Sequence, residues 1–329
     1  MLVKILVTGG LGFIGSNFIH YILKNFPDYE ILNVDDEFHG SDHMNLKEFK
    51  NNNRYQFVKG NITNFELMKK LIDKVNGVIN FAAESHVDRS ISNARPFIES
   101  NIIGVFTILE ALKDKKKRFV QISTDEVFGS LKDTSATENF VMNPSSPYSA
   151  SKASAELLVN SYVITYGHDA LITRCTNNYG PRQFLEKLIP KVIFLAKNNK
   201  KIPIYGTGKN VRDWIYVDDH CNAIMKAFLH GKSGESYNIS TSNEIDNLTI
   251  VNKILLLLGK SPEVIEYVAD RPGHDFRYSL DSSKIRNELG WKPQIEFNEG
   301  IKKTVNWYME NKLWDTKIDE NIYSKNPWK

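Results

Sequence analysis

Residues 5–18 form the segment ILVTGGLGFIGSNF, in which an apolar run is followed by closely spaced glycines and then by a second apolar stretch. Gly9, Gly12 and Gly15 give the spacing G-x-x-G-x-x-G, and Gly10 with the last two gives G-x-G-x-x-G. Glycines between a strand and a helix let the backbone turn tightly and approach a pyrophosphate at the helix N-terminus. Because the flanking segments supply the strand and the helix, the match predicts a Rossmann-type dinucleotide site.

An acidic residue at the end of the next predicted strand indicates which dinucleotide binds. Asp35 lies 20 residues beyond Gly15. A carboxylate there accepts hydrogen bonds from the adenosine ribose and repels a 2′-phosphate. Asp36 and Glu37 add negative charge, and no arginine follows closely. The sequence therefore favours NAD over NADP, and the alternative is that Asp35 is an ordinary turn residue at a strand end.

Apolar strand-like runs alternate with helix-like segments through the first half of the chain. Short runs of Val, Ile and Phe with little polar alternation are typical of strands covered on both faces. Repeated strand–helix–strand units imply a parallel, doubly wound sheet. We expect strands at Leu2–Thr8, Glu30–Val34, Gln56–Lys59, Val78–Ala82, Arg118–Ser123 and Ala170–Arg174. We expect helices near Phe13–Lys24, Phe65–Val75, Pro96–Lys113 and Tyr148–Tyr166.

The pattern changes after about Asn177, where segments rich in Gly and Pro separate the predicted helices. These helices lie near Glu186–Asn198, Val217–His230, Thr249–Leu258 and Ile301–Asn311. The predicted fold class is α/β, with a Rossmann-type doubly wound parallel sheet and a smaller C-terminal substrate-binding α/β domain. The expected NAD-binding domain is 1–176, to which 213–236 returns, and 177–329 is mainly the substrate-binding domain.

The composition argues against several classes of protein. The chain of 329 residues carries a formal net charge of +3 and has no long basic stripe that would indicate a nucleic-acid partner. Cys175 and Cys221 stand in no metal-binding or redox spacing, so we expect buried thiols in a reducing compartment and no metal. The sequence shows no signal-peptide pattern. It also has no apolar run near the roughly 20 residues that span a bilayer, which predicts a cytoplasmic protein without a membrane partner.

Two adjacent carboxylates follow the fifth predicted strand. In the segment FVQISTDEVFG, residues 119–129, Asp125 and Glu126 stand between a core strand and an apolar turn. One explanation is a solvated loop. The other is a catalytic acid and base at the edge of the sheet where open α/β folds bind their ligands. Two carboxyl groups with separated pKa values can protonate one substrate atom and deprotonate another.

Tyr148 and Lys152 form a second candidate pair. Residues four apart on a helix share a face. A lysine ammonium near the phenol, together with a positively charged nicotinamide, stabilises phenolate and makes Tyr148 a base near neutral pH. The alternative is a pair on an ordinary helix surface, because Y-x-x-x-K is common by chance. The dinucleotide loop upstream favours the catalytic interpretation.

With these motifs the chain resembles the extended short-chain dehydrogenase/reductase family over nearly its whole length, and within it the sugar-nucleotide 4,6-dehydratases. The resemblance is carried by TGGLGFIGS, AAESHVDRSI, ISTDEVFG, SPYSASKAS, NNYGPRQFLEKLIP, PIYGTG, VRDWIYVDDH and RPGHDFRYSLD. It implies NAD-dependent dehydration of an NDP-glucose to the 4-keto-6-deoxy sugar nucleotide. The preferred substrate is dTDP-glucose, and UDP-glucose is the alternative.

The resemblance also implies a role for each candidate catalytic residue. Tyr148, assisted by Lys152, takes the proton of the C4 hydroxyl while hydride passes from C4 to NAD, and Thr124 binds the sugar. Glu126 then removes the C5 proton, and Asp125 protonates the departing C6 hydroxyl. Hydride returns to C6 and C5 is reprotonated, so NAD is regenerated within one turnover.

Further contacts follow from the same resemblance. The cofactor-binding residues would be Gly9, Gly12, Phe13, Ile14, Gly15, Asp35, Asn61, Ile62, Ala82, Ala83, Ser85, Ser100, Tyr148, Lys152 and Asn178. The substrate-binding residues would be Ser85, Asp88, Thr124, Asn177, Lys187, Leu188, Pro203, Ile204, Tyr205, Arg212, Asn247, Asp270, Arg271, Pro272, Gly273 and His274. Arg212 is expected at the diphosphate, because a guanidinium fork matches phosphate oxygens. It could instead pair with Asp213 or Asp218 at the surface, and His274 could be a turn residue.

Two segments depart from the family pattern. The family usually has Asp-Ile after the third strand, where the Asp binds the adenine amino group, and this chain has Asn61 and Ile62 there. An asparagine oxygen still accepts that hydrogen bond, so we expect weaker or different adenine contacts. The loop DDEFHGSDHMN, residues 35–45, replaces the family's Leu-Thr-Tyr stretch, so its contacts with the cofactor are not predicted.

Other functions remain open at this point. An NDP-sugar epimerase or decarboxylase shares the scaffold but generally lacks the Asp-Glu pair. A non-catalytic nucleotide-sugar binder would not need the Tyr-Lys and Asp-Glu pairs. The helices at Pro96–Lys113 and Tyr148–Tyr166 resemble those that pair subunits in the family, so a homodimer is expected, although the same apolar residues could simply cover the sheet.

Overall fold

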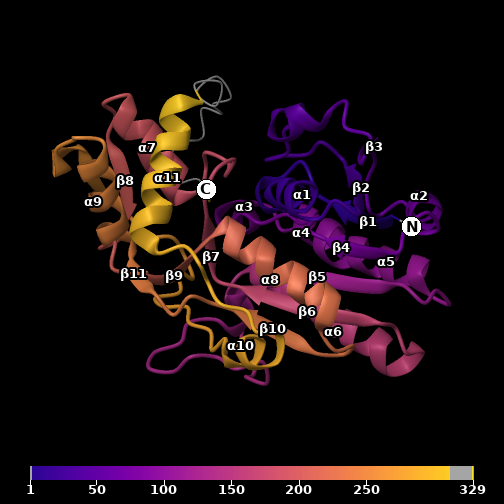
Figure 1. Ribbon diagram of the computed structural model, residues 1–329. Helices are drawn as coiled ribbons and strands as arrows, with labels where there is room; N and C mark the ends of the chain where they lie inside the picture. Colours follow the sequence, from indigo (N-terminus) through magenta and orange to yellow (C-terminus); the bar gives the residue numbers. More distant parts are fainter. Residues whose placement is uncertain (1, 312–327, 329) are drawn as a thin grey trace.

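A seven-stranded parallel sheet forms the centre of the computed structural model, which describes residues 2–311 and 328 (Figure 1). The strand order is β10-β6-β5-β4-β1-β2-β3, which confirms the predicted doubly wound parallel sheet. The strand order reverses between β1 and β4, where open α/β sheets form their ligand crevice. The strands are β1 (Val3–Thr8), β2 (Tyr29–Asp35), β3 (Tyr55–Lys59), β4 (Gly77–Asn80), β5 (Arg118–Thr124), β6 (Ala170–Cys175) and β10 (Ser236–Ile239).

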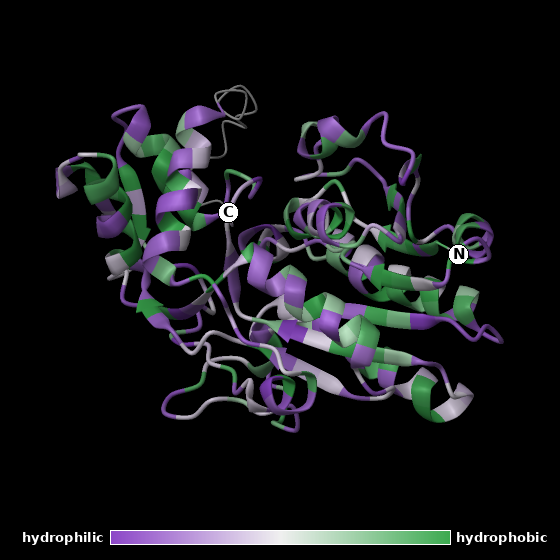
Figure 2. Cartoon of the chain, in the orientation of Figure 1, coloured by the Kyte–Doolittle hydropathy of each residue, from purple (hydrophilic) through white to green (hydrophobic). Residues whose placement is uncertain are grey.

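Helices cover both faces of this sheet. One face is covered by α1 (Phe13–Asn25) and α8 (Val217–His230), and the other by α2 (Phe65–Ile72), α5 (Gly104–Leu112) and α6 (Pro147–Tyr166). Two apolar cores result, because Ile5 and Val7 of β1 face α1 whereas Leu6 faces the α2–α5–α6 side. Hydrophobic residues therefore follow one another along the central strands, as Figure 2 shows, and do not alternate with polar ones.

The ends of α6 are fixed by local sequence. Ser146 caps its N-terminus through reciprocal hydrogen bonds with Ser149, and Pro147 lies in the first turn. Gly167 ends the helix in the left-handed region with a φ of 68°. These caps determine where the first turns of α6, which carry Tyr148 and Lys152, begin relative to the ends of the strands.

The remaining elements form a second layer around a separate apolar core. A three-stranded sheet of order β11-β9-β7 and a pair β12-β8 pack with α7, α9 and α11 (Figure 1, left). The bounds are β7 (Asn177–Tyr179), α7 (Leu188–Lys197), β8 (Ile202–Tyr205), β9 (Val211–Tyr216), β11 (Glu244–Asp246), α9 (Asn247–Leu257), β12 (Ile265–Val268) and α11 (Phe297–Glu310).

The chain passes between the two layers more than once. After β9 it enters α8, which packs against α1, and then β10, which pairs with β6 as the edge strand of the main sheet. It returns to the second layer through β11. The segment 213–236, which we expected to return to the NAD-binding domain, thus holds the end of β9, all of α8 and the first residue of β10.

The connections differ most from the sequence-based expectation. The helix expected at Pro96–Lys113 is three pieces, α4 (Arg95–Ile98), the π-helical turn η2 (Glu99–Ile103) and α5. Within η2, Asn101 accepts from the Glu84 backbone N–H at 3.0 Å and donates to its carbonyl at 2.9 Å, which explains why the helix widens there. The short elements that the prediction missed are β7 to β12, α3 (Val87–Ser92), α10 (Ser283–Leu289), η1 (His43–Phe49), η3 (Asp125–Phe128) and η4 (Pro262–Val264).

Candidate active site

A cleft of about 570 Å³ lies at the carboxyl ends of β1, β2, β4, β5 and β6. Every residue that the sequence assigned to the cofactor lines this cleft, and so does every predicted catalytic residue. Of the predicted substrate set, the cleft contains Ser85, Thr124, Asn177 and Lys187. The others lie outside its lining: Asp88, Leu188, Pro203, Ile204, Tyr205, Arg212, Asn247 and Asp270–His274.

The glycine loop brings three backbone segments unusually close together. Gly9 has a φ of +68°, and a Cβ placed on it would lie 2.6 Å from the backbone nitrogen of Ala82. A Cβ on Gly15 would lie 2.4 Å from the carbonyl oxygen of Gly9. Only glycine fits at either position, so the end of β1, the segment after β4 and the first turn of α1 converge. Such a cradle exposes backbone N–H groups to a pyrophosphate.

Asp35 joins the glycine loop to the loop that follows β2. Its carboxylate accepts hydrogen bonds from the backbone N–H groups of Leu11 at 3.0 Å and Glu37 at 2.9 Å, and from the Ser41 hydroxyl at 2.8 Å. Burial raises the pKa of Asp35, and these hydrogen bonds oppose the shift. A buried carboxylate aligned by backbone donors at this strand end fits a ribose hydroxyl.

The side chain of Asn61 is already engaged within the protein. Its Oδ1 accepts from the Thr63 backbone N–H at 2.8 Å and from the Thr63 hydroxyl at 2.7 Å. Its Nδ2 donates to Oδ2 of Asp36 at 2.8 Å. The Asn61 oxygen that we expected to accept from the adenine amino group is thus already shared with Thr63. The carboxylate next to Asn61 is that of Asp36.

The acidic pair lies in a tight turn at the end of β5. Thr124 caps the turn η3, because its hydroxyl accepts from the Glu126 backbone N–H at 3.3 Å and donates to Oδ1 of Asp125 at 3.1 Å. Asp125 is only 3% exposed, and its Oδ2 has no hydrogen-bond partner within the described residues. The solvated-loop alternative is therefore wrong for Asp125.

Electrostatics separates the two carboxyl groups. Burial, together with the neighbouring charge of Glu126, raises the pKa of Asp125 well above its usual range. Burial also raises the pKa of Glu126, but the charges of Arg271 and Lys187 oppose it. Asp125 is thus the better proton donor of the pair near neutral pH, and Glu126 is the better acceptor.

Tyr148 and Lys152 are both buried at the start of α6, so the alternative of an ordinary helix-surface pair is wrong. The Lys152 ammonium donates to the carbonyl of Ile122 at 2.6 Å, and burial lowers its pKa to about 8 against the opposing charge of Glu156. Burial and the charges of Glu126 and Cys175 raise the pKa of Tyr148 well above its usual range, although a hydrogen bond with Thr124 opposes them.

The groups of the chain bear on only one part of the expectation for Tyr148. Without a cofactor, burial and the nearby acids raise the pKa of Tyr148 and favour the neutral phenol. The phenolate near neutral pH that we expected therefore requires the other contributor, the positive charge of a nicotinamide.

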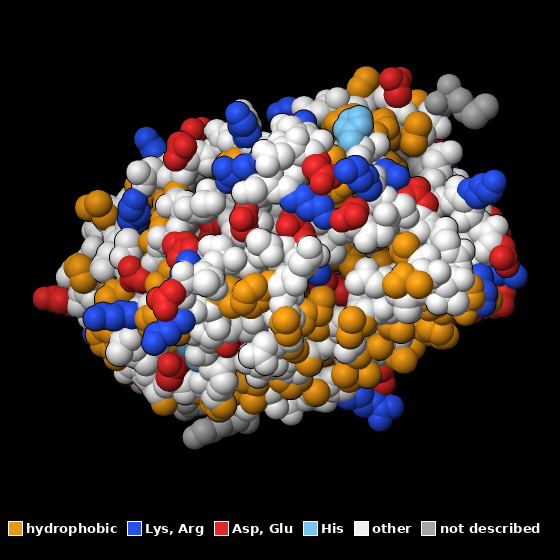
Figure 3. Space-filling model, turned by 90° about the horizontal axis from the view of Figure 1, so that it is seen from below, with side chains coloured by type: hydrophobic (Ala, Val, Ile, Leu, Met, Phe, Trp, Pro, Cys, Tyr) orange, Lys and Arg blue, Asp and Glu red, His pale blue; other side chains and the backbone are white. Residues whose placement is uncertain are grey.

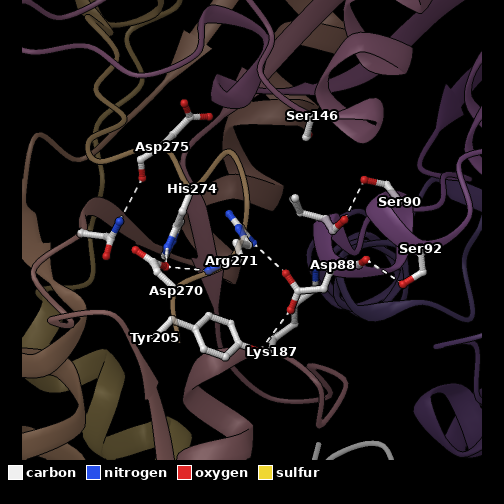
Figure 4. A network of polar contacts seen from close by, with 12 residues as sticks. Asp88, Ser90, Ser92, Ser146, Lys187, Tyr205, Asp270, Arg271, His274 and Asp275 are labelled. Atoms are coloured by element: carbon white, nitrogen blue, oxygen red, sulfur yellow. Dashed lines mark hydrogen bonds and ion pairs between the residues drawn. The ribbon is translucent and has the colours of Figure 1, made fainter. Parts of the chain in front are cut away.

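A second polar cluster connects the loop 270–275 to helix α3 beyond the cleft (Figure 4). Nη1 of Arg271 lies 3.1 Å from Oδ1 of Asp88, and the Tyr205 hydroxyl donates to Oδ2 of Asp88 at 3.2 Å. Nδ1 of His274 is 2.6 Å from Oδ1 of Asp270, and burial lowers the pKa of His274 to about 4. The Nε of Arg271 is buried with no hydrogen-bond partner in the described part of the chain, which leaves one donor for an anion.

Arg212 is buried and does not form the surface ion pair considered as an alternative. Its guanidinium donates to the carbonyls of Asp275 at 2.9 Å and Phe276 at 3.1 Å and stacks 4.2 Å from the Tyr278 ring centroid. Asp213 instead accepts hydrogen bonds from a separate loop, formed by Ser240, Thr241, Ser242 and Asn243.

Two features of the site were not predicted. The Tyr278 hydroxyl donates to Asp275 at 2.7 Å and lies 3.5 Å from Oε2 of Glu126. Tyr278 belongs to the family-like segment RPGHDFRYSLD, so the resemblance marked its position without giving it a role. Across the cleft, Nε2 of His39 lies 3.0 Å from Oε2 of Glu186. No sequence signal marks that contact, because His39 belongs to the loop that departs from the family.

Glu186 remains ionised in this arrangement. Burial alone would raise its pKa, but the hydrogen bond with His39 and the charges of His86 and Lys187 lower it to about 2. No group of three or more His, Cys, Asp or Glu side chains that could hold a metal ion occurs within residues 2–311.

Comparisons with known proteins agree with this geometry. The family model described as GDP-mannose 4,6 dehydratase matches residues 6–304. The dTDP-glucose 4,6-dehydratase of Mycobacterium tuberculosis (strain CDC 1551 / Oshkosh) is 43% identical over 315 residues, covering 94% of this chain and 95% of the relative. The low-salt glycan biosynthesis protein Agl12 of Haloferax volcanii is 46% identical over 306 residues, covering 93% and 98%.

Solved structures show the same relationship. The crystal structure of DesIV, a dTDP-glucose 4,6-dehydratase from Streptomyces venezuelae with NAD bound, superposes with a TM-score of 0.93 at 43% identity. The superposition covers 95% of this chain and 98% of DesIV. The match thus includes both layers of the fold and the cleft at the carboxyl ends of the strands. The chain belongs to the GDP-mannose 4,6 dehydratase family, and its relatives within that family include dTDP-glucose 4,6-dehydratases.

Proposed function

We propose that the protein dehydrates dTDP-glucose to the 4-keto-6-deoxy sugar nucleotide with NAD as a resident cofactor. The single observation that carries the proposal is the placement of Asp125 and Glu126. Both carboxyl groups lie in the cleft with Tyr148 and Lys152, and their pKa values are raised to different degrees. Relatives covering nearly the whole chain are dTDP-glucose 4,6-dehydratases.

The residues present fit NAD. The cradle at Gly9 and Gly15 has no room for a Cβ, and Asp35 stands at the end of β2 with a buried carboxylate. When bound there, NAD accepts the hydride from C4 of the sugar and returns it to C6. In this proposal Gly12, Phe13, Ile14, Ile62 and the segment after β4 complete the cofactor wall.

The first step assigned to the chain is removal of the C4 hydroxyl proton by Tyr148. Its phenol lies within hydrogen-bonding reach of Thr124, which would orient the same sugar hydroxyl. Lys152 holds its ammonium at the carbonyl of Ile122, so its position is fixed before the substrate arrives. Tyr148 would act as a base once the positive charge of an oxidised cofactor bound in the cradle lowered its pKa.

Elimination of water is assigned to the acidic pair. Glu126 removes the C5 proton, which the 4-ketone acidifies, and Asp125 donates a proton to the departing C6 hydroxyl. Burial beside another carboxylate raises the pKa of Asp125 well above its usual range, which favours the protonated form that a proton donor needs. Glu126 is the group whose charged form is supported by Arg271 and Lys187.

Substrate binding is proposed to draw on three cations, Lys187 in the cleft lining and Arg212 and Arg271 beyond it. Arg212, Arg271 and Lys187 lie close enough to influence the pKa of Glu126, so their charges converge on the sugar end of the site. The unpartnered Nε of Arg271 suits a diphosphate oxygen. The remaining substrate contacts are proposed for Tyr205, Asn247 and the loop 270–274.

A homodimer is proposed through α5 and α6. Phe106 of α5 and Leu157 and Ile164 of α6 are exposed, the last at 85%. Figure 3 shows hydrophobic side chains gathered over the face seen from below, toward the side on which α6 lies in Figure 1.

Within the described residues, no helix is long and apolar enough to span a membrane. We place the reaction in the cytoplasm, where the free thiols of Cys175 and Cys221 stay reduced.

Mass spectrometry of the product tests the proposed function. Purified protein is incubated with dTDP-glucose and, separately, with UDP-glucose. Loss of one water from dTDP-glucose, without net accumulation of NADH, is the expected result. Loss of water from UDP-glucose alone would show that the substrate carries uridine and not thymidine. A product of unchanged mass would point to epimerisation, and no product despite tight binding would point to a non-catalytic binder.

A further inference from the structure

A buried ion pair that the proposed mechanism does not use lies directly behind the catalytic residues. Arg174 of β6 and Glu156 of α6 are 3% and 0% exposed at their side chains. Nη2 of Arg174 donates to Oε2 of Glu156 at 2.6 Å, and its Nε donates to both carboxylate oxygens, to Oε2 at 2.9 Å and to Oε1 at 3.1 Å. This is the forked geometry that makes arginine–carboxylate pairs directional as well as strong.

The same guanidinium reaches two other segments. Its Nη1 donates to the carbonyl of Glu138 at 3.0 Å, and the guanidinium carbon lies 5.0 Å from the ring centroid of Phe128. Phe128 ends the turn η3 that begins with Asp125 and Glu126. Arg174 therefore contacts both the helix that carries Tyr148 and Lys152 and the turn that carries the acidic pair.

The spacing along α6 extends this connection. Glu156 follows Lys152 by four residues, so the two side chains lie on one face of the helix. Lys152 binds the carbonyl of Ile122 in β5, and Glu156 binds Arg174 in β6. Ser123 pairs with Arg174 across the two strands. The helix is thus attached to adjacent strands at two successive turns, next to the point where β5 leaves the sheet.

We propose that the Glu156–Arg174 pair is a positioning device for the reaction. It holds α6 and the turn η3 in one register, so that Tyr148 and Lys152 meet the same sugar as Asp125 and Glu126. The inference rests on the proposed function for its catalytic consequence, but not for its structural one. Displacement of a reacting group by about 1 Å can lower a rate about 100-fold, which makes this register important.

The pair also contributes charge near Lys152. Glu156 on α6 and Cys175 on β6 act on the pKa of that ammonium, and Arg174 on β6 is the partner of Glu156. Tyr148 on α6 and the acidic pair at the end of β5 line the same cleft. Removing the Glu156 carboxylate leaves the Arg174 cation unopposed. Removing Arg174 leaves the carboxylate unopposed, so the two changes act on Lys152 in opposite directions.

The test compares E156Q and R174Q with the unchanged protein. The Lys152 ammonium is titrated by nuclear magnetic resonance in protein with isotope-labelled lysine, its signal identified by its loss in K152M. We expect the titration midpoint of Lys152 to fall in E156Q and to rise in R174Q, by about one unit each. In both, we expect kcat with dTDP-glucose to fall about 100-fold and KM to stay within about threefold.

A matched control removes an arginine partner at the opposite end of the same two strands. Nε of Arg118, at the start of β5, lies 3.0 Å from Oδ2 of Asp169, which immediately precedes β6. D169N should leave kcat and the Lys152 midpoint unchanged. Values of kcat in E156Q and R174Q equal to that of D169N, or a Lys152 midpoint that moves in neither variant, would overturn the proposal.

The design also covers two other outcomes, in which the variants do not fold or the proposed function is wrong. If breaking the buried pair prevents folding, as judged by circular dichroism, R174K carries the test, because it keeps the charge but loses the fork. We expect R174K to lower kcat about tenfold with the Lys152 midpoint unchanged, and a wild-type kcat would contradict the proposal. If the unchanged protein dehydrates neither sugar nucleotide while the Lys152 midpoints move as stated, the proposed function fails and the positioning pair stands.

Discussion

The proposed cofactor side and the proposed sugar side of the site differ in how many of their polar groups already have protein partners. On the cofactor side, the glycine cradle is fixed by backbone contacts, and Asp35 is aligned by donors from its own loop and the glycine loop. On the sugar side, Arg271 is held by Asp88, and Arg212 donates to backbone carbonyls. The first side is assembled before ligand binds, whereas a ligand on the second side must compete with protein partners.

The difference between the two sides can be explained by how long each ligand stays bound. A dinucleotide that stays bound through turnover favours a rigid wall, because preorganisation lowers the entropy lost on binding. A substrate that must leave after each turnover is better served by cations that return to an internal partner. Arg271 next to Asp88 is such a cation, since an unpaired buried guanidinium would be costly once the product has gone.

The largest expected effect comes from the acidic turn, which both sides share. E126Q keeps the size of the side chain but cannot accept the C5 proton, so we expect kcat to fall about 1,000-fold. The measurement is the rate of water loss from dTDP-glucose, with bound NAD quantified after gel filtration. E138Q is the control, because Glu138 accepts from Asn238 away from the cleft lining. A rate within about twofold of wild type in E126Q would refute its role as the base.

The second prediction distinguishes the steric crowding at Gly9 from the backbone strain that any left-handed glycine position imposes on another residue. Gly9 and Gly167 share a φ of +68°, but only at Gly9 would a Cβ meet other atoms within 4 Å. We expect G9A to weaken NAD binding by about 2–3 kcal/mol, or about 30- to 150-fold, because the end of β1 must move away from Ala82. Isothermal titration calorimetry on protein stripped of NAD measures this.

G167A provides the matched comparison. It should leave NAD binding unchanged and lower the free energy of unfolding by about 1 kcal/mol, the strain of a left-handed alanine. Equal NAD affinities in G9A and G167A would show that the close packing at Gly9 is not needed for NAD binding.

The third prediction addresses the sugar side. R271M should raise KM for dTDP-glucose about 30-fold while NAD affinity stays unchanged, because the lost contact is a charge-assisted one to the substrate. R277M is the control, since Arg277, six residues after Arg271, pairs with Glu244, whereas Arg271 pairs with Asp88 and acts on Glu126. A matching rise in KM for R277M would show that the effect is general loss of positive charge.

The effect of pH is expected to be about tenfold within one unit above the pKa of Lys152. Burial lowers the pKa of Lys152 to about 8, so the ammonium is fully present below that pH and is lost as the pH rises through it. We expect kcat to fall about tenfold for each unit above that value, measured with saturating substrate. A kcat that stays constant to pH 10 would show that the Lys152 charge is not required.

The stability linkage of the same group has the opposite sign. The folded pKa of Lys152 lies below its unfolded value, so the unfolded chain binds more protons between about pH 8 and 10. This group alone therefore makes the folded protein more stable as the pH rises through that window. Activity and this contribution to stability should move in opposite directions, which thermal melts alongside the kinetics can check.

The cofactor side was largely predictable from the sequence because its signals are local. The glycine spacing, Asp35 and the strand of residues 118–124 lie within single strand–turn–helix units, and the lining matches the predicted set. The fold class followed from the same repetition. The interruption at Glu99–Ile103 could not be predicted, because it depends on the contact between Asn101 and the backbone of Glu84.

The sugar side was less predictable because its contacts join distant segments. Arg271 and Asp88 are 183 residues apart, and Tyr278 approaches Glu126 from 152 residues away. Neither spacing has a periodic signal. The short strands β7, β8, β11 and β12 were missed for the same reason, since three or four residues carry too little pattern. The size of the burial effect on the pKa of Tyr148 was also not predictable, because it depends on the assembled cleft.

The late return of β10 has a consequence for synthesis of the chain. Until residue 239 has left the ribosome, β6 is the outermost strand of the growing sheet and presents an unpaired row of backbone donors and acceptors. A nascent chain that pauses between β6 and β10 thus exposes a template for pairing with another chain. Ribosome-bound chains ending just before and just after β10 should differ in their demand for chaperones, which makes translation speed through this stretch a determinant of yield.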